Sequence, residues 1–251
     1  MTSIREEMWK TRGILFNFAV TDLKTMATQS EYITGVSAKY HYNNEQPDGN
    51  PAPSTAYGVF TGLKATVEHA LKTDLKGVRV AIQGVGHVGY RLAQHLHAHG
   101  AELFVTDIFP EGVERAVSEL GATAVKPEEL YGLDVDVIAP CALGASINDE
   151  TVPEIKAKVI AGAANNQLAR ESMGEVLRQK GIVYAPDYVI NAGGVIDIYH
   201  QRMESSSEAM REHIEQIGLT LKEIYQRADS DEKATNIVAN VIAEERFNHK
   251  A

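Results

Sequence analysis

The sequence has little cysteine and little positive charge, and it has no long apolar run. Cys141 is the single cysteine among 251 residues, so the chain cannot form an internal disulfide. The 34 acidic residues outnumber the 24 basic ones and leave a formal net charge of −10, which argues against a nucleic-acid surface and against binding to an anionic membrane. No stretch approaches the roughly 18 uninterrupted apolar residues of a membrane span, and the opening MTSIREEMWK has acids where a secretory signal has an apolar segment. We therefore expect a cytoplasmic protein whose partners are small molecules, with no nucleic acid and no membrane among them.

Apart from these shortages the composition is that of a globular protein, and strand-like and helix-like segments alternate from residue 76 onward. Hydrophobic residues make up 44% of the chain, enough for a real core. Apolar runs predict strands at 78–83, 102–107, 135–139, 158–162 and 182–184, and helical spacing predicts helices at 86–99, 110–119, 151–156 and 170–180. Such alternation predicts an α/β fold, with a doubly wound, mostly parallel sheet and helices on both faces.

Further helices and a loop flank this alternating region. Residues 36–53 are rich in Pro, Asn, Gly and Asp, which indicates a loop or hinge. Residues 54–71 are spaced for a helix with one buried face, and Ser54 or Thr55 would cap it. Residues 206–247 carry apolar positions that predict two more helices.

A glycine-spaced turn follows the first strand of the alternating region. Gly84, Gly86 and Gly89 have the G-x-G-x-x-G spacing, and they stand between a strand and a helix. In that context the first glycine permits a tight turn, the second lets the backbone approach a pyrophosphate, and the third lets the helix pack on the strand. The unpaired amides at the start of the helix would face the phosphates. The alternative is an ordinary glycine-rich turn between strand and helix.

An acidic residue stands where a dinucleotide site needs one. Asp107 ends the second predicted strand, 18 residues beyond Gly89. Its carboxylate would accept hydrogen bonds from the ribose hydroxyls of an adenosine. With Glu111 nearby and no Lys or Arg between them, the charge would repel a 2′-phosphate. We therefore predict NAD as the cofactor, in preference to NADP.

Three other predicted strands end in loops of small or amide-bearing residues, at 140–144, 163–166 and 185–194. Ligands of open α/β sheets bind beyond the carboxyl ends of the strands, so these loops would line one edge of the site. Asparagine amides there can donate to and accept from a carboxamide, although a loop-capping role is the alternative for each. Cys141 is interpreted as a small strand-end residue rather than a nucleophile, because no base is identifiable beside it.

A histidine cluster in the helix after the turn invites a metal site. His95 and His99 share a helix face, with His97 between them. Neither a carboxylate nor a cysteine completes the set of ligands. We predict a solvated helix face and no metal.

From about residue 49 to the C-terminus the chain resembles the amino-acid dehydrogenases of the leucine, phenylalanine and valine dehydrogenase family. That region is roughly four fifths of the chain, and the stretches in it that match are GNPAPSTAYGV, VAIQGVGHVGYRLAQHLHAHGAELFVTDI, DVDVIAPCALG, KVIAGAANNQL and GIVYAPDYVINAGGVI. The resemblance implies a Rossmann-like domain and NAD-dependent oxidative deamination of an amino acid to a 2-oxo acid. It implies that the pyrophosphate is wrapped by Gly84, Val85, Gly86, His87, Val88, Gly89 and Tyr90, that Asp107 holds the ribose, and that Thr55, Cys141, Ala142, Asn165 and Asn191 surround the nicotinamide. His87 departs from the asparagine common in the family, which leaves a contact through backbone amides unaffected.

The resemblance does not extend to the amino-terminal substrate domain of the family. That domain carries a glycine-rich segment that ends in a catalytic lysine, a second lysine that grips the substrate carboxylate, and an aspartate. Here the only Gly-Gly pair is Gly193-Gly194, and a short match puts Leu15 at the position of the aspartate. A catalytic lysine needs a buried pocket that lowers its pKa, and Lys10, Lys24 and Lys39 have no recognisable surroundings of that kind.

The chain is accordingly divided into three parts. We expect 1–50 to be a truncated segment of the substrate domain plus the hinge loop, 51–204 to be the NAD-binding domain, and 205–251 to be C-terminal helices. Loss of the substrate domain would leave an apolar face uncovered, so we expect a homodimer or other homo-oligomer. The contact would form through edge pairing of residues 14–20, in a strand predicted at 12–20, or through packing of the last helices.

Three hypotheses for the function stay open. The chain is a divergent member that binds NAD but lacks the usual catalytic lysines, or a working oxidoreductase on a different small substrate, or a noncatalytic partner protein. They differ in whether a proton donor or base reaches the nicotinamide. The candidates are Lys64, Asp187 and Tyr188, and since none stands out the catalytic residues and the substrate remain unassigned.

Overall fold

The computed structural model describes residue 43 and residues 50–248. The strand predicted at 12–20 and nearly all of the loop predicted at 36–53 lie outside this part of the chain. The described elements are α3 (Ala52–Leu71), β1 (Arg79–Gln83), α4 (Gly89–Ala98), β2 (Glu102–Thr106), α5 (Pro110–Leu120), β3 (Thr123–Ala124), the 3-10 helix η1 (Pro127–Gly132), β4 (Val137–Pro140), β5 (Val159–Ile160), α6 (Met173–Gln179), β6 (Val183–Tyr184), α7 (Asp187–Ile190), α8 (Gly193–Arg202), α9 (Ser207–Asp231) and α10 (Thr235–Asn248).

Six parallel strands form one sheet, in the order β3-β2-β1-β4-β5-β6. β1 lies inside the sheet, where Val80 pairs with Leu103 of β2 on one side and with Val137 of β4 on the other. The winding of the chain reverses at β1, and dinucleotide-binding sheets of this strand order hold their ligand at that point, beyond the carboxyl ends of the strands. The predicted doubly wound α/β fold is confirmed.

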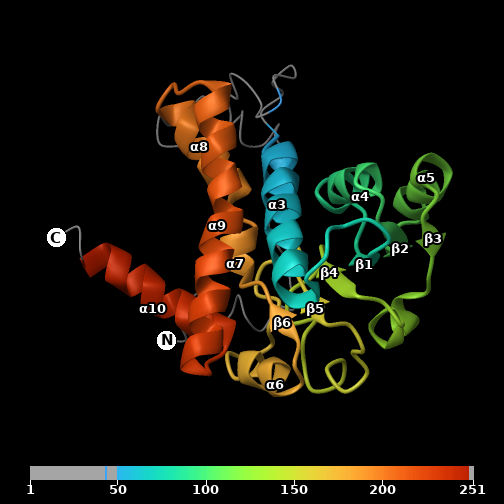
Figure 1. Ribbon diagram of the computed structural model, residues 1–251. Coiled ribbons are helices and arrows are strands. Elements are labelled where there is room, and N and C mark those ends of the chain that lie inside the picture. Colours follow the sequence, from blue (N-terminus) through green and yellow to red (C-terminus); the bar gives the residue numbers. More distant parts are fainter. Residues whose placement is uncertain (1–42, 44–49, 249–251) are drawn as a thin grey trace, which may run out of the picture.

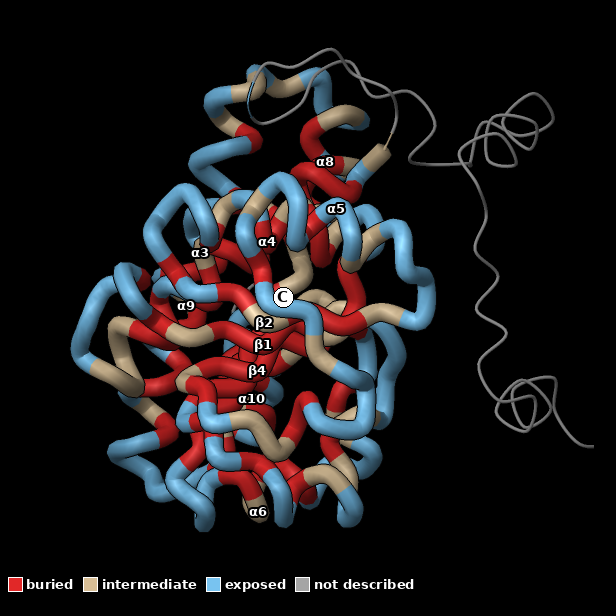
Figure 2. Tube along the Cα trace, turned by 90° about the vertical axis from the view of Figure 1, so that its right-hand side faces the viewer, coloured by how far each residue is buried: buried red, intermediate tan, exposed pale blue. Residues whose placement is uncertain are grey.

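The two faces of the sheet contribute to separate cores. Successive side chains of a strand point to opposite faces. Val80 and Ile82 join a core with α3, α4, α9 and α10, whereas Ala81 joins a second core with η1, α6 and the segment 147–157. Figure 2 shows the buried strands β1, β2 and β4 in the middle of the molecule. Because both faces are covered, the strands have continuous apolar sequences, which is why they could be predicted.

α3 packs against α9, and the two helices run side by side (Figure 1). The predicted buried face is confirmed, since Val59, Leu63 and Val67 are fully buried. Small residues of α3 are buried on a further side of the helix. A side chain at Gly62 would come within 2.8 Å of Leu221 of α9. α3 is therefore a central helix rather than a surface helix.

The predicted cap of α3 is wrong. The helix begins at Ala52, directly after Pro51, and the side-chain oxygen of Asn50 accepts a hydrogen bond of 3.0 Å from the amide of Ala52. Ser54 and Thr55 consequently lie inside the first turn of the helix. Their hydroxyl groups are available for contacts other than capping, and both make one.

Several boundaries between sheet and helices also differ from the prediction. α4 begins at Gly89 rather than at residue 86. The segment predicted as a helix at 151–156 is a series of turns, in which the side chain of Asn148 accepts hydrogen bonds from the amides of Glu150 and Thr151, at 2.9 and 3.0 Å. Such local bonds between side chain and backbone favour turns over a regular helix. The short elements β3 and η1 were not predicted, and the loop predicted at 185–194 contains α7 and the first two residues of α8.

The two helices predicted in 206–247 are confirmed as α9 and α10. Ser206 caps α9 by accepting a hydrogen bond of 3.2 Å from the amide of Ala209. Ile214 and Leu221 of α9 are buried in the same core as β1, so the last helices are part of the packing around the sheet. Within residues 43 and 50–248, no helix has the length and apolarity required to cross a bilayer.

Candidate functional site

The glycine turn after β1 is packed tightly at two of its three glycines. Gly84 has a φ of +94°, and a side chain there would come within 2.8 Å of the Cβ of Ala142. A side chain at Gly89 would overlap the carbonyl oxygen of Gly84 and come within 3.2 Å of Cys141. Both positions therefore require glycine, the first for its backbone conformation and the second for the close packing of α4 on the turn.

The middle glycine is different, because nothing lies within 4 Å of the space that a side chain would occupy at Gly86. The amides of Gly86, His87, Val88 and Gly89 donate no hydrogen bond to another described residue. They stand at the positive end of α4, where unpaired amides and the helix dipole favour an anion. An open space beside free amides is the arrangement that a pyrophosphate requires.

The other three residues of the predicted pyrophosphate contact are already engaged within the protein. Gly84 donates its amide to Thr106 at 2.8 Å, and Tyr90 donates its amide to the carbonyl of Gly86 at 3.0 Å. The hydroxyl of Tyr90 bonds Glu119 of α5 at 2.5 Å, and burial raises the pKa of this phenol. The amide of Val85 bonds Asp107. The free donors are thus confined to residues 86–89. Tyr90 links α4 to α5 through the hydrogen bond of its hydroxyl to Glu119.

Asp107 lies at the end of β2, directly beside the turn. Its two carboxylate oxygens accept hydrogen bonds from the amides of Val85 and Phe109, at 2.7 and 3.0 Å. Each oxygen keeps a further lone pair, so the group can still accept from ribose hydroxyls. The next residue, Ile108, was not predicted as part of the site, and its side chain is 80% exposed at the rim. The available signal in the sequence was a large apolar residue directly after the acid.

The end of β4 forms the other wall of the turn. Cys141 donates its amide to Gln83 at 2.7 Å, which continues the pairing of β1 with β4. Burial raises the pKa of the Cys141 thiol to about 12, so this thiol is neutral and is not a nucleophile. Ala142 packs against Gly84, and Leu143, also missed, is 62% exposed. Ile108 and Leu143 follow β2 and β4, the two strands that flank β1.

The two predicted asparagines meet at the ends of β5 and α7. The side-chain nitrogen of Asn191 donates to the side-chain oxygen of Asn165 at 2.6 Å and to the carbonyl of Ala163 at 3.3 Å. Because that carbonyl requires a donor, the Asn191 amide has one orientation. The pair leaves the nitrogen of Asn165 and the oxygen of Asn191 without a partner among the described residues. Asn191 also follows α7 as its C-cap residue, which fits the loop-capping alternative, whereas a binding role stays a prediction.

A buried glutamine supports this pair and was missed. Gln167 is fully buried, and its side-chain nitrogen donates to the carbonyls of Gly162 and Ala164, at 2.8 and 3.0 Å. It thereby fixes the loop that carries Asn165. In the sequence it is an ordinary polar residue of a strand-end loop, and no pattern marked it as buried.

Thr55 lies in the first turn of α3, against the start of α8. Its hydroxyl donates to the carbonyl of Pro51 at 3.0 Å, and a side chain at Gly194 would come within 2.6 Å of that hydroxyl. Gly194 follows Asn191 by three positions. Thr55 is therefore held near the asparagine pair by the packing of α3 on α8.

None of the three candidate bases has the surroundings of a base. Lys64 is exposed on α3. The hydroxyl of Tyr188 donates to Asn240 of α10 at 2.7 Å, and burial followed by the charge of Asp187 raises its pKa. Asp187 accepts a hydrogen bond of 3.3 Å from the amide of Gln167. No lysine is buried in the part of the chain that the structure describes.

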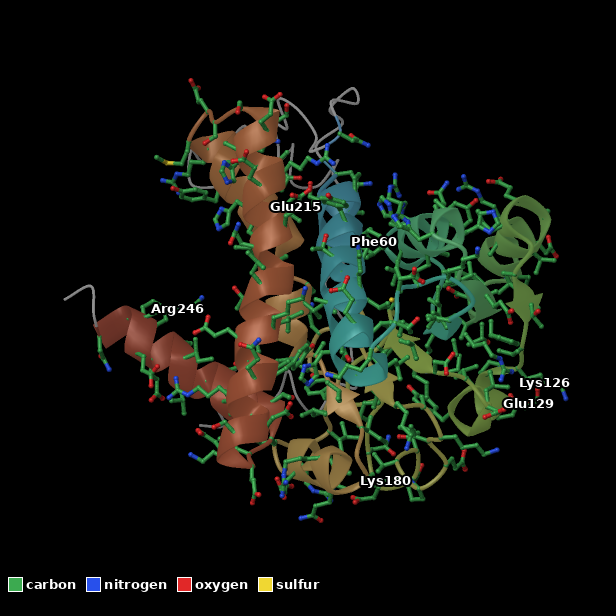
Figure 3. The ribbon with its side chains drawn as sticks, viewed as in Figure 1. Phe60, Lys126, Glu129, Lys180, Glu215 and Arg246 are labelled. Carbon is green, nitrogen blue, oxygen red and sulfur yellow. The ribbon has the colours of Figure 1, made fainter. Side chains whose placement is uncertain are left out.

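The histidine cluster is only partly the solvated face that was predicted. His97 and His99 are exposed, but His95 is half-buried and stacks on Phe60 of α3 with 5.1 Å between ring centroids. Figure 3 shows Phe60 between α3 and α4. Burial lowers the pKa of His95, and the neighbouring His99 lowers it further. The ring is therefore a packing residue of the α3–α4 interface.

Comparison with known proteins agrees with this geometry. A family model described as Glutamate/Leucine/Phenylalanine/Valine dehydrogenase matches residues 51–108 and 110–248. The leucine dehydrogenase of Bacillus cereus is 48% identical over 229 residues, which are 91% of this chain and 61% of that protein. The L-tryptophan dehydrogenase of Nostoc punctiforme is 43% identical over 235 residues, which are 93% of this chain and 64% of that protein. The chain thus spans less than two thirds of the length of these curated relatives.

Solved structures support the same relationship. The crystal structure of L-tryptophan dehydrogenase from Nostoc punctiforme matches with a TM-score of 0.81 at 41% identity, over 93% of this chain and 66% of that chain. The hetero-hexameric glutamate dehydrogenase from Thermus thermophilus matches with a TM-score of 0.69 at 22% identity, over 92% of this chain and 60% of that chain, which supports the fold alone. The resemblance drawn from the sequence motifs is confirmed by these matches.

Proposed function

Because the chain belongs to the glutamate/leucine/phenylalanine/valine dehydrogenase family, we propose that it binds NAD along the carboxyl edge of its sheet. One observation carries the proposal. Four consecutive free amides, from Gly86 to Gly89, border an open space at the start of α4, next to a carboxylate at the end of β2. This combination fits a diphosphate and a ribose, and it is difficult to explain as packing.

The residues along the edge fit the parts of the cofactor in order. The pyrophosphate takes the amides of residues 86–89, and the ribose hydroxyls take the remaining lone pairs of Asp107. The exposed side chains of Ile108 and Leu143, which follow the two strands that flank β1, would contact the adenine ring. When bound, NAD supplies the hydride acceptor of an oxidation.

Thr55, Cys141 and Ala142, together with the residues that follow β5 and α7, would hold the nicotinamide half. Its carboxamide has one donor and one acceptor, and the asparagine pair offers the matching free groups, the nitrogen of Asn165 and the oxygen of Asn191. The neutral thiol of Cys141 contributes shape rather than charge. These small and amide-bearing side chains orient the ring and exclude water from one of its faces.

NAD is preferred to NADP at this site. The carboxylate of Asp107 would meet a 2′-phosphate directly, and Glu111 in the first turn of α5 adds a second negative charge. Both carboxylates would repel the 2′-phosphate of NADP, and no basic residue stands between them in the sequence to compensate.

For the chemistry, we propose that the chain is the cofactor-binding part of an amino-acid dehydrogenase that is divergent and lacks the usual catalytic lysines. The family reaction is oxidative deamination of an L-amino acid to a 2-oxo acid. A lysine base needs burial to lower its pKa, and every lysine of residues 43 and 50–248 is exposed or half-exposed. A working oxidoreductase on another small substrate is the alternative, and a noncatalytic partner protein is a further one.

We also propose a cytoplasmic homodimer or other homo-oligomer. The support is apolar surface on the last helices, where Leu219 is 58% exposed and Phe247 is 79% exposed. Light scattering of the purified chain tests the assembly, and a monodisperse monomer contradicts it.

Titration of the purified chain with NADH, followed by fluorescence, tests the binding. A turnover screen with leucine, phenylalanine, valine and tryptophan then tests the chemistry. Saturable binding without turnover supports a divergent cofactor-binding chain. Turnover of any of the four amino acids contradicts the proposal that the chain lacks the catalytic lysines. Absence of NADH binding contradicts the proposal as a whole.

A further inference from the structure

A buried hydrogen bond joins the first turn of α3 to α8, and no part of the proposed cofactor contact includes it. The hydroxyl of Ser54 donates to a carboxylate oxygen of Asp197 at 2.6 Å, across 143 positions of the sequence. Ser54 is fully buried and Asp197 is 3% exposed. We propose that Ser54 and Asp197 are positioning residues that set the nicotinamide side of the site, an inference that rests on the proposed function.

The carboxylate of Asp197 is satisfied by neutral donors. Its second oxygen accepts a hydrogen bond of 2.9 Å from the side chain of Gln201, one turn further along α8. No lysine or arginine of the described residues forms an ion pair with it. A buried carboxylate costs much desolvation energy, and an apolar pair would hold two helices together at less cost. Such a group is better explained by the geometry that it imposes than by the stability that it adds.

The helices that it joins approach each other backbone to backbone. A side chain at Gly193 would overlap the carbonyl oxygen of Ser54, and one at Gly58 would come within 3.2 Å of the Cα of Gly193. Contacts made by glycine permit sliding and rotation, because they have no interlocking side chains. The directed bond from Ser54 to Asp197 supplies the missing constraint, since it fixes the rotation and the axial register of α8 on α3.

The two ends of this contact carry residues of the nicotinamide pocket. Thr55 directly follows Ser54, and Asn191 precedes the first residue of α8 by two positions. A change in the register of α8 therefore moves Asn191 relative to Thr55, while it leaves the glycine turn and Asp107 in place. Displacements of about 1 Å at a reacting group have large effects on alignment. The bond thus acts on the nicotinamide half of the cofactor and spares the adenosine half.

Calorimetric titration of the full chain with NADH and with ADP-ribose, which lacks the nicotinamide, separates these halves. In the parent chain we expect NADH to bind more tightly than ADP-ribose. In Ser54→Ala, which leaves Asp197 without its short donor, we expect NADH binding to weaken roughly tenfold and ADP-ribose binding to change less than about twofold. Should Ser54→Ala not fold, Ser54→Cys places a weaker donor at the same position, and the expected loss has the same selectivity and a smaller size.

A matched control lies on the same helix. Thr66 is also fully buried, and its hydroxyl bonds Tyr225 of α9 at 2.7 Å, roughly three helical turns from Ser54. Thr66→Val removes a buried hydroxyl from α3 without touching α8, so it should lower the melting temperature and leave the ratio of the two affinities unchanged. An equal loss for both ligands in Ser54→Ala, no loss for either, or no preference for NADH in the parent overturns the inference. A parent chain that binds neither ligand contradicts the proposed function itself.

Discussion

The carboxylate of Asp107 accepts a hydrogen bond of 2.7 Å from the backbone amide of Val85, so the acid at the end of β2 holds the turn at the end of β1. A ribose-binding acid is ordinarily considered for its contact with the cofactor. Here the same group also shapes the proposed phosphate turn, because Val85 directly precedes the free amides. The two halves of the proposed adenosine site would therefore be coupled through one side chain.

Removal of this carboxylate should weaken NADH binding by more than one contact. In Asp107→Ala we expect a loss of roughly 10- to 100-fold, since hydrogen bonds to a charged group contribute about 1.5–3 kcal/mol. The preference for NADH over NADPH should shrink as well, because the repulsion of a 2′-phosphate is removed. Fluorescence titration with both cofactors measures the two effects.

Asp134→Asn is the control for the loss of an acid. Asp134 is 89% exposed and pairs with Arg79 at the opposite end of β1, so its removal should leave both affinities unchanged. Titration curves of Asp107→Ala that coincide with those of the parent would refute the role of Asp107.

The three glycines of the turn should separate into two classes. Gly86→Ala adds a methyl group to open space, so we expect a normal melting temperature and NADH binding at least roughly tenfold weaker. Gly89→Ala forces a methyl group against the carbonyl of Gly84, and such overpacking typically costs about 1–3 kcal/mol, so we expect a lower free energy of unfolding. Denaturant unfolding and NADH titration of both variants give the comparison. The reverse assignment of effects contradicts the open pyrophosphate space.

The contact between Asn165 and Asn191 predicts a selective effect on the nicotinamide. Asn165→Ala removes one hydrogen-bonding group, and a net contribution of about 0.5–1.5 kcal/mol corresponds to a roughly 2- to 10-fold weaker binding of NADH. ADP-ribose binding should not change. The matched control is Asn240→Ala, which removes an exposed side-chain amide of α10 that bonds Tyr188 of α7. It should change neither affinity. Equal weakening of both ligands in Asn165→Ala would count against its proposed role.

Much of the fold could be predicted because local sequence and global packing agree in the sheet. The strand around Val80 is apolar at its three central positions since both faces are covered, and the spacing of Gly84 and Gly89 follows from backbone packing that only glycine allows. The start of α8 could not be predicted on the same grounds. Gly193 and Gly194 suggested a loop, but they lie in a helix that needs small residues to approach α3.

The site could be predicted in its residue types but not in its connections. Asp107 was identified from its spacing, whereas its bond to Val85 depends on the pairing of β1 with β2. Gln167 and the partnership of Ser54 with Asp197 left no local signal, because burial and contacts between distant segments arise only when the chain folds. Sequence patterns therefore indicate candidate ligand-contacting groups more readily than the groups that hold them in place.

The buried ring of His95 predicts a loss of stability in acid. Its pKa in the folded chain is lowered by burial first and by His99 second, relative to the unfolded value near 6.5. Above that value both states are neutral and His95 contributes nothing. As the pH falls through about 6.5 the unfolded chain takes up a proton that the folded chain does not, so the free energy of unfolding decreases until the folded ring is protonated as well.

His95→Gln should therefore weaken the dependence of stability on pH, and His97→Gln should not. The two residues share α4, but only His95 packs on Phe60, whereas His97 is exposed. One proton limits the difference in slope to about 1.4 kcal/mol per pH unit.

Because Gln at position 95 also loses packing, the absolute stabilities of the variants are not compared. The quantity to compare is the change in unfolding free energy between roughly pH 7.5 and pH 5.5 within each variant, measured by denaturant titration. His69 and His200 also have lowered pKa values and remain in both variants, so they contribute equally to each slope. Parallel slopes for His95→Gln and the parent would show that the ring is protonated without cost in the folded chain.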